Sequence, residues 1–169
     1  MNAHDIAAPS EWVVRWAPLI KRGTVLDVAC GHGRHARFFL SRGLHVVALD
    51  REAQDITGAR FIQADLEGGN AWPLPGEQFE GIVVTNYLHR PLFPRLLEAL
   101  APGGVLIYET FMLGNERFGR PSNPEFLLRP GELREAFREL TEIGFEEGAV
   151  SSPKPAMIQR LCAMRAGKG

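Results

Sequence analysis

Short apolar runs alternate with segments of helical periodicity along most of this chain. The runs HVVAL (45–49) and GIVV (81–84) show almost no polar alternation, which is typical of strands that are buried on both faces. Parallel strands need long crossover connections, and helices usually supply them. The alternation therefore predicts an α/β fold in which helices cover both faces of a mostly parallel sheet.

We expect one domain over residues 1–169, with residues 1–23 as an N-terminal helix that is capped by Ser10 and stopped by Gly23. Residues 112–130 are rich in Gly, Pro and Asn, and a loop of this length is usually functional. Between the second and third strands the chain is too short for a full helix, so we expect a turn or a single helical coil. Expected strands span 24–29, 45–49, 60–63, 80–85, 105–111, 145–150 and 157–164, and further helices span 34–42, 93–100 and 132–140.

Composition narrows the class of protein. The chain has 45% hydrophobic and 23% charged residues, as in soluble globular proteins, and a net charge of −1 gives no global attraction to nucleic acid. No apolar run is long enough to span a bilayer. The two cysteines, Cys30 and Cys162, make no disulfide framework, so we expect a cytoplasmic protein without membrane contact.

A glycine loop follows the first expected strand. Residues 31–36, GHGRHA, satisfy the G-x-G-x-x-G/A pattern that is usually assigned to dinucleotide phosphates. Gly31 and Gly33 let the backbone approach a ligand, and the start of the next helix attracts anions. Asp27, however, places a carboxylate just before the loop, which suits an ammonium group and not a phosphate. The loop therefore favours a ligand with both a cation and an anion, as in an α-amino acid.

Two further acids close the next two strands. Asp50 lies about 20 residues beyond the loop, where folds of this kind place a carboxylate on ribose hydroxyls. Asp65 could accept a hydrogen bond from the exocyclic amine of adenine. Each acid alone could equally be an N-cap or a solvated turn residue. Together, an amino acid, a ribose and an adenine describe S-adenosylmethionine.

Two other ligands would suit parts of the same pattern. The loop pattern alone would suit a nicotinamide oxidoreductase, but Asp27 and the absence of a recognisable Tyr/Lys pair for hydride transfer disfavour it. Cys30, His32 and His35 form C-x-H-x-x-H, which invites a zinc site. No nearby fourth ligand accompanies them, so we expect no metal.

Four motifs in order resemble those of class I S-adenosylmethionine-dependent methyltransferases: VLDVACGHGRHARFFLSRGLHVVALD, FIQADLE, GIVVTNYLH and LAPGGVLIYETF. The chain looks most similar to the compact methyltransferase-domain group that includes tellurite-resistance-type enzymes. The resemblance implies a three-layer Rossmann-like sandwich with a seven-stranded, mostly parallel sheet whose last strand is antiparallel. It implies these cofactor-binding residues: Asp27, Ala29, Cys30, Gly31, Gly33, Asp50, Arg51, Asp65, Leu66 and Asn86.

Two departures from the family pattern affect the substrate. The short segment after Asp50 would leave the adenine pocket more open. The sequence TNYL (85–88) lacks the two prolines of the Asn-Pro-Pro-Tyr motif found in methylators of nucleobase amino groups, so an exocyclic-amine acceptor loses support.

Methyl transfer from a sulfonium needs neither a metal nor a protein nucleophile. His89, just beyond the fourth strand, is our candidate for a general base, although it could be a surface histidine. Tyr87 and Asn86 could orient the acceptor. Glu109 could hold the substrate or could bind backbone N–H groups of the long loop.

Candidate substrate-binding residues lie in the long loop and in the first helix. Arg117 and Arg120 could clamp an anionic acceptor or could be solvated. Trp12 and Trp16 could form a lid over the acceptor or could pack in the core. The sequence thus predicts a methyltransferase that acts on a small molecule or an exposed heteroatom. The alternatives are a cofactor-binding regulatory module without turnover and an RNA methyltransferase that uses local arginines.

Overall fold

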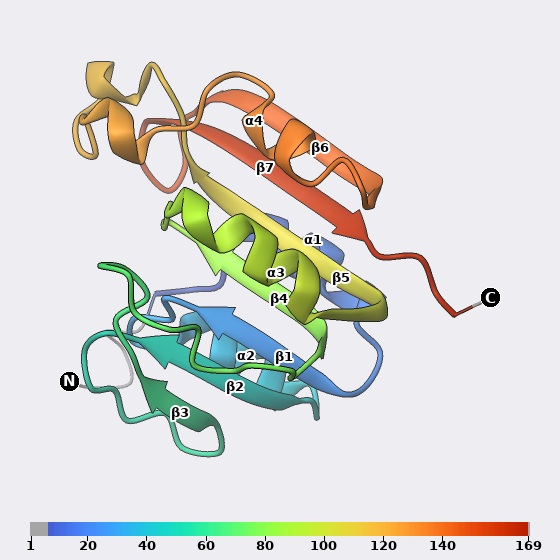
Figure 1. Cartoon of the computed structure of the whole chain (residues 1–169). Helices are drawn as coiled ribbons and strands as arrows, with labels where there is room; N and C mark the ends of the chain where they lie inside the picture. Colours follow the sequence, from blue (N-terminus) through green and yellow to red (C-terminus); the bar gives the residue numbers. More distant parts are fainter. Residues whose placement is uncertain (1–6, 169) are drawn as a thin grey trace.

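A seven-stranded sheet runs through the computed structural model, which describes residues 7–168 (Figure 1). The strand order is β3-β2-β1-β4-β5-β7-β6. Neighbouring strands pair in parallel except for β7, which is antiparallel to both β5 and β6. This confirms the predicted α/β sheet with an antiparallel last strand. The strands are β1 (Thr24–Val28), β2 (His45–Asp50), β3 (Arg60–Gln63), β4 (Phe79–Thr85), β5 (Leu100–Phe111), β6 (Thr141–Val150) and β7 (Ala156–Met164).

Helices cover both faces of the sheet, so the molecule has three layers (Figure 1). On one face, α1 (Glu11–Trp16) and α2 (Arg34–Ser41) bury Trp12 and Phe39 against β1, β2 and β5. On the other face, α3 (Phe93–Ala99) and α4 (Glu132–Ala136) bring Phe93 and, just after α4, Phe137 into contact with Tyr108 of β5. The sheet therefore separates two apolar cores, as the uninterrupted apolar strands require.

Several elements differ in length from those predicted. The first helix ends at Trp16 and continues as the 3-10 turn η2 (Ala17–Leu19), because Pro18 has no N–H with which to extend the α-helical ladder. The strands β5 and β6 begin earlier than predicted, since backbone pairing with neighbouring strands continues beyond the apolar runs. The helix predicted over 132–140 ends at Ala136, and Leu140 reaches the core from a turn.

Two crossover connections in the sheet contain no helix. Residues 51–59 form turns between β2 and β3, as predicted from their short length. Residues 64–78, between β3 and β4, are also irregular, and fully buried Leu74 with half-buried Trp72 covers the core there in place of a helix. The carboxyl ends of β2 and β3 are consequently not covered by crossover helices.

The segment 112–130 is irregular but held in place. It contains the short 3-10 helices η4 (Asn115–Arg117) and η5 (Pro124–Phe126). The side chain of Asn115 donates to Pro121 O and accepts from Met157 N. Arg90, in the 3-10 helix η3 (Arg90–Leu92), donates to Glu125 O and Leu127 O and also to both oxygens of buried Glu132. The bonds of Asn115 and Arg90 fix the two ends of the segment to β7 and to η3.

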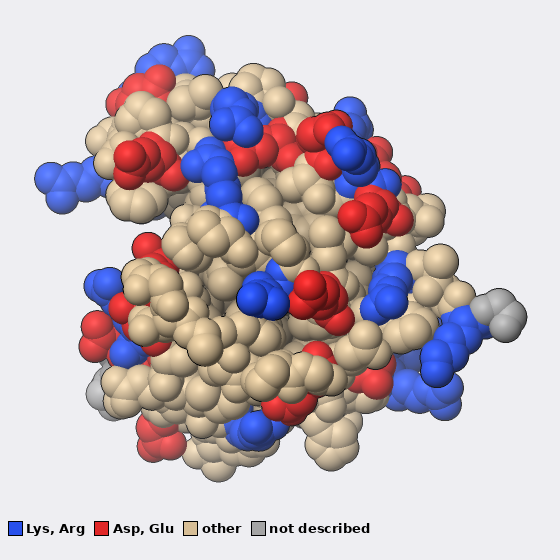
Figure 2. All heavy atoms as spheres, viewed as in Figure 1, with Lys and Arg blue, Asp and Glu red and all other residues tan. Residues whose placement is uncertain are grey.

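Charge is distributed without a large patch of one sign on the face shown in Figure 2, where basic and acidic residues are interspersed. No helix among residues 7–168 has the length and apolar character needed to cross a bilayer.

Candidate functional site

The loop after β1 turns sharply at the carboxyl edge of the sheet. Ala29 and Gly31 both have positive φ values, 55° and 54°, and Gly33 is the N-cap of α2 with a φ of 86°. A Cβ added to Gly31 would meet no atom within 4 Å, so the space above this residue is open. The loop thus offers bare backbone to a ligand, which is the use predicted for its glycines.

Asp50 holds this loop from the end of β2. Its Oδ2 accepts from Gly31 N at 2.8 Å, and its Oδ1 accepts from Glu52 N at 2.9 Å. Each carboxylate oxygen keeps a further lone pair for a ligand hydroxyl. Asp50 therefore both shapes the glycine loop and faces the open space beside it.

A cavity of about 240 Å³, here called the Asp50 cavity, lies beside the loop. Five predicted cofactor residues line it together with Glu67 and Tyr87: Ala29, Asp50, Arg51, Asp65 and Leu66. Tyr87 donates its hydroxyl hydrogen to Glu67 Oε2 at 3.1 Å, and burial and this neighbouring carboxylate raise the pKa of the phenol. Sequence reasoning missed Glu67, although it follows Asp65 by two residues.

Asp27 and Cys30 are buried beneath the loop and line neither of the cavities described here. Asp27 is 2% exposed, and its Oδ2 accepts from Ala36 N at 3.1 Å. Burial raises the pKa of this carboxyl group to about 7, so near neutral pH it readily gains or loses a proton. Burial likewise raises the pKa of the Cys30 thiol to about 12, which leaves it an unreactive thiol.

A second cavity, about 500 Å³ in volume and here called the Glu109 cavity, opens at the ends of β4 and β5. Asn86 lines this cavity while its neighbour Tyr87 lines the Asp50 cavity, so consecutive residues after β4 contribute to the two cavities. The cavity is lined by residues 7–11, Arg34, Asn86, Glu109, Phe111, Val150, residues 152–154, Ala156, Ile158 and Arg160.

Glu109 is the centre of a hydrogen-bonded network behind this cavity. Its Oε2 accepts from Arg160 Nε at 2.6 Å, and its Oε1 accepts from Ser10 Oγ at 3.0 Å. Ser10 N in turn donates to Nε2 of His35 at 2.9 Å, and the other ring nitrogen lies 3.5 Å from Thr85 Oγ1. Burial lowers the pKa of His35 to about 3, so its ring is neutral and accepts through Nε2.

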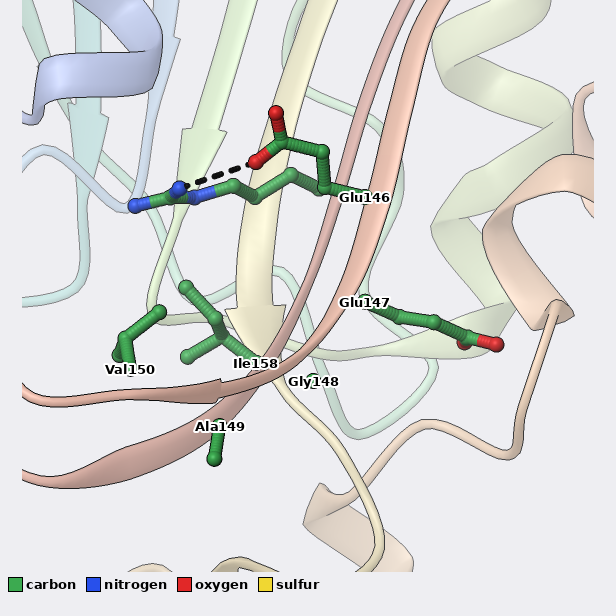
Figure 3. A pocket seen from close by; sticks show the side chains of 7 residues that line it. Glu146, Glu147, Gly148, Ala149, Val150 and Ile158 are labelled. Atoms are coloured by element: carbon green, nitrogen blue, oxygen red, sulfur yellow. Dashed lines mark hydrogen bonds and ion pairs between the residues drawn. The ribbon is translucent and has the colours of Figure 1, made fainter.

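The hairpin of β6 and β7 supplies one wall of the Glu109 cavity. Figure 3 shows a neighbouring pocket of about 90 Å³ on the same hairpin, in which Glu146 and Glu147 extend to opposite sides of β6, and Val150 and Ile158 lie on the same side of the hairpin as Glu146. Glu146 Oε2 accepts from Arg160 Nη1 at 3.4 Å. On the Glu109 cavity itself, the hairpin contributes apolar Val150, Ala156 and Ile158, Arg160 farther along β7, and Lys154 from the turn at its tip.

Some charged side chains that line the Glu109 cavity have an ion-pair partner, and others have none among the described residues. Glu109 is paired with Arg160, and Glu11 is paired with Arg15. Arg34 donates to Ala8 O, and neither Arg34 nor Lys154 has a carboxylate within ion-pair distance among residues 7–168. Two cations thus border the cavity without an anionic partner in the described part of the chain.

The predicted catalytic residues are only partly brought together. Asn86, at a φ of 54°, and Glu109 line the Glu109 cavity, whereas Tyr87 lines the Asp50 cavity. His89 lies elsewhere: its ring borders a separate cavity beside Trp72, and its Nδ1 is 3.9 Å from Glu67 Oε1. His89 therefore does not line the Glu109 cavity, and its role as a general base stays a prediction.

The predicted substrate residues also need correction. Trp12 is 1% exposed and donates its indole N–H to Leu161 O at 3.1 Å, and Trp16 packs beside it with ring centroids 5.7 Å apart, so neither forms a lid. Arg117 and Arg120 are exposed and do not line the Glu109 cavity. The start of the first helix, and not its tryptophans, borders the cavity.

The C-x-H-x-x-H residues are not arranged as a metal site. His35 has both ring nitrogens directed at protein partners, and His32 is exposed. Within residues 7–168, no three His, Cys, Asp or Glu residues form a group that could hold a metal ion.

The model of one protein family, described as "Methyltransferase domain", matches residues 1–161 of this chain. Among curated relatives, the trans-aconitate 2-methyltransferase of Paracidovorax citrulli (strain AAC00-1) is 34% identical over 113 residues, which cover 58% of this chain and 42% of the relative. The malonyl-[acyl-carrier protein] O-methyltransferase of Enterobacter lignolyticus (strain SCF1) is 32% identical over 138 residues, which cover 74% of this chain and 48% of that relative. The chain thus spans less than half the length of these two relatives.

Solved structures share the fold at lower identity. TehB from Haemophilus influenzae superposes with a TM-score of 0.77 at 17% identity, covering 96% of this chain and 64% of that one. The 1,6-didemethyltoxoflavin-N1-methyltransferase of Burkholderia thailandensis was solved with 1,6-didemethyltoxoflavin and S-adenosylhomocysteine bound. It superposes with a TM-score of 0.67 at 20% identity, and the match covers 92% of this chain and 76% of that one.

Proposed function

The chain belongs to the methyltransferase-domain family of class I S-adenosylmethionine-dependent enzymes, and from this we propose that it methylates a small molecule bound in the Glu109 cavity. The observation that carries the proposal is that the consecutive residues Asn86 and Tyr87, at the end of β4, line the Glu109 cavity and the Asp50 cavity respectively. A nucleoside in the Asp50 cavity would extend its reactive end past these residues toward an acceptor. Placement at the carboxyl ends of the strands is the general rule for ligands of such sheets.

The residues of the Asp50 cavity suit the nucleoside part of the cofactor. Asp50 would accept hydrogen bonds from the ribose hydroxyls, and Asp65 from the exocyclic amine of adenine beside Leu66. The open space above Gly31 would take the methionine part, with its carboxylate near Arg34 at the start of α2. Ionised Asp27 would then balance the ammonium group from beneath the loop.

The cofactor supplies a methyl group that is already activated on a sulfonium, so the protein's part is to position the acceptor and exclude water. The Glu109 network fixes Ser10, and with it the start of α1, against β5 and β7. Apolar Phe111, Val150 and Ile158 reduce the water that can reach an acceptor in the cavity.

The free thiols of Cys30 and Cys162 suit a cytoplasmic location, which we include in the proposal.

RNA methylation receives no support. The arginines that were candidates for an RNA-binding patch are Arg90, Arg95, Arg117 and Arg120. Arg90 is committed to Glu132, and Arg95 lies 3.5 Å from Glu98. The named relatives act on trans-aconitate and on malonyl-[acyl-carrier protein]. A small acceptor therefore remains the better interpretation, and a 500 Å³ cavity is of a size that holds one.

Calorimetric titration with S-adenosylmethionine, S-adenosylhomocysteine and NAD tests the cofactor. We expect the first two to bind and NAD to fail, and binding of NAD alone would reject the proposal. At 100 times its dissociation constant, a bound ligand adds about 2.7 kcal/mol of apparent stability. Asp50→Asn should remove most of that increment, whereas Asp55→Asn, an exposed carboxylate nearby, should keep it.

A further inference from the structure

Residues 7–11, here called the 7–11 wall, line the Glu109 cavity where the chain enters α1. The first four residues of this wall belong to no helix or strand. A backbone segment outside secondary structure keeps one position only where specific bonds hold it. The bonds between the 7–11 wall and the rest of the molecule therefore decide how closed the cavity is on this side.

Ser10 attaches the 7–11 wall through both its backbone and its side chain. Ser10 N donates to His35 Nε2 at 2.9 Å, and Ser10 Oγ donates to Glu109 Oε1 at 3.0 Å. The same hydroxyl caps α1 by accepting from Trp12 N at 3.2 Å. Ser10, His35 and Glu109 are all buried, so water competes little for these bonds. Removal of the acceptor on His35 would leave the buried N–H of Ser10 unpaired, which is costly.

His35 connects the 7–11 wall to two elements of the central fold. It is the second residue of α2, and its Nδ1 lies 3.5 Å from the hydroxyl of Thr85, the last residue of β4. The preceding residue of α2, Arg34, donates to Ala8 O at 3.1 Å. Two consecutive residues of α2 thus hold the wall at Ala8 and at Ser10. His35 does not itself line the Glu109 cavity, so it can act on an acceptor only through the wall.

We propose that Ser10 and His35 are positioning residues for the acceptor: they hold the 7–11 wall in place, so that the acceptor binds a cavity already closed on this side. This inference rests on the proposed function. Without the bond from Ser10 N to His35, the wall would leave its closed position in a large fraction of molecules. The apparent affinity for the acceptor would then fall in proportion to the fraction that remains closed.

The assay needs no purified acceptor. The chain is incubated with saturating S-adenosylmethionine that carries a tritiated methyl group and with a dilution series of the low-molecular-mass fraction of a cell extract. The rate of labelling of the main product, plotted against extract concentration, gives a maximal rate and a relative KM for the acceptor. A variant that is partly unfolded has a lower maximal rate and an unchanged relative KM. A displaced wall instead raises the relative KM, so the two effects are separable.

Variants at both residues test the proposal. His35→Leu should raise the relative KM about tenfold, because Ser10 N loses its buried acceptor. His35→Gln, whose amide oxygen can accept from Ser10 N, should restore most of the affinity. Ser10→Ala loses only the bond to Glu109 and should raise the relative KM about threefold. His45→Leu, a matched change at an exposed histidine that begins β2 at the opposite edge of the sheet, should leave it unchanged. Affinity for S-adenosylhomocysteine, measured by calorimetry, should be unaltered in all four variants.

The outcomes separate this inference from the proposed function. An unchanged relative KM in both His35→Leu and Ser10→Ala overturns the positioning role, even where the maximal rate falls, and leaves the methyltransferase proposal standing. If His35→Leu does not fold, the result for Ser10→Ala decides the question. A relative KM as high in His35→Gln as in His35→Leu would also refute the role of the bond to Ser10 N. Cofactor binding without any incorporation of label by the wild type counts against both proposals.

Discussion

Two buried titratable groups should shift the stability of this protein in opposite directions with pH. His35 is 2% exposed, and its pKa falls from 6.5 to about 3 on folding. Asp27 is equally buried, and its pKa rises from 3.8 to about 7. Between roughly pH 4 and 6.5, the unfolded chain binds the proton of His35 and the folded chain binds the proton of Asp27. The two contributions therefore nearly cancel in the wild type.

The magnitude follows from about 1.36 kcal/mol per pKa unit. The stability associated with neutral His35 is complete above pH 6.5 and is lost as pH falls toward 3, which amounts to about 2 kcal/mol between pH 8 and pH 5. The stability associated with protonated Asp27 is complete below pH 3.8 and is lost as pH rises through 7. This amounts to about 2.7 kcal/mol over the same interval, with the opposite sign.

Urea unfolding of Asp27→Asn and His35→Gln at pH 5 and pH 8 isolates the two contributions. Relative to the wild type, acidification from pH 8 to pH 5 should cost Asp27→Asn about 2 to 3 kcal/mol more and should stabilise His35→Gln by about 2 kcal/mol. The exposed residues Asp55 and His45 provide matched controls, and Asp55→Asn and His45→Gln should follow the wild type. Variants of Asp27 and His35 that also follow the wild type would show that burial does not set these pKa values.

Three further results are expected. If the ammonium of S-adenosylmethionine pairs with Asp27, binding at pH 7 should release about half a proton, measured by calorimetry in buffers of different ionisation enthalpy; no release would argue against this pairing. Gly33→Ala should lower stability in urea by about 1 kcal/mol or more, because the residue has a φ of 86° and its Cβ would lie 2.7 Å from Ile56 Cδ1; an unchanged midpoint would contradict the strained geometry. Trp12→Phe should cost about 1 kcal/mol through loss of the bond to Leu161 O, with KM for the acceptor unchanged; a raised KM would restore the lid interpretation.

The sequence was sufficient to predict the sheet and the two aspartates of the Asp50 cavity, although not Glu67. Asp50 is the last residue of β2 and Asp65 follows β3 by two residues, and the carboxyl ends of parallel strands meet at one edge of the sheet. Asp50 and Asp65 were therefore placed together from strand positions alone, and the structure brings them into one cavity.

The Glu109 cavity could not be predicted in the same way, because its residues come together through long-range packing. Glu109 and Arg160 face each other only because β7 pairs antiparallel with β5, and Ser10 joins them from the opposite end of the chain. His89 illustrates that a position just after a strand does not fix where its side chain lies. It lies just beyond β4 in sequence, but the chain turns into η3 there and directs the ring toward Glu67.

The two cavities have walls of different origin. The Asp50 cavity is built from the loops that end β1 to β4, whereas much of the lining of the Glu109 cavity comes from residues 7–11 and 150–156, outside the central strands. Natural selection can therefore alter, lengthen or replace these two segments without disturbing the nucleoside half. A new substrate range can be acquired by changes at two peripheral points of the gene. Laboratory libraries of variants confined to the same two segments would change acceptor preference and leave the residues of the Asp50 cavity unchanged.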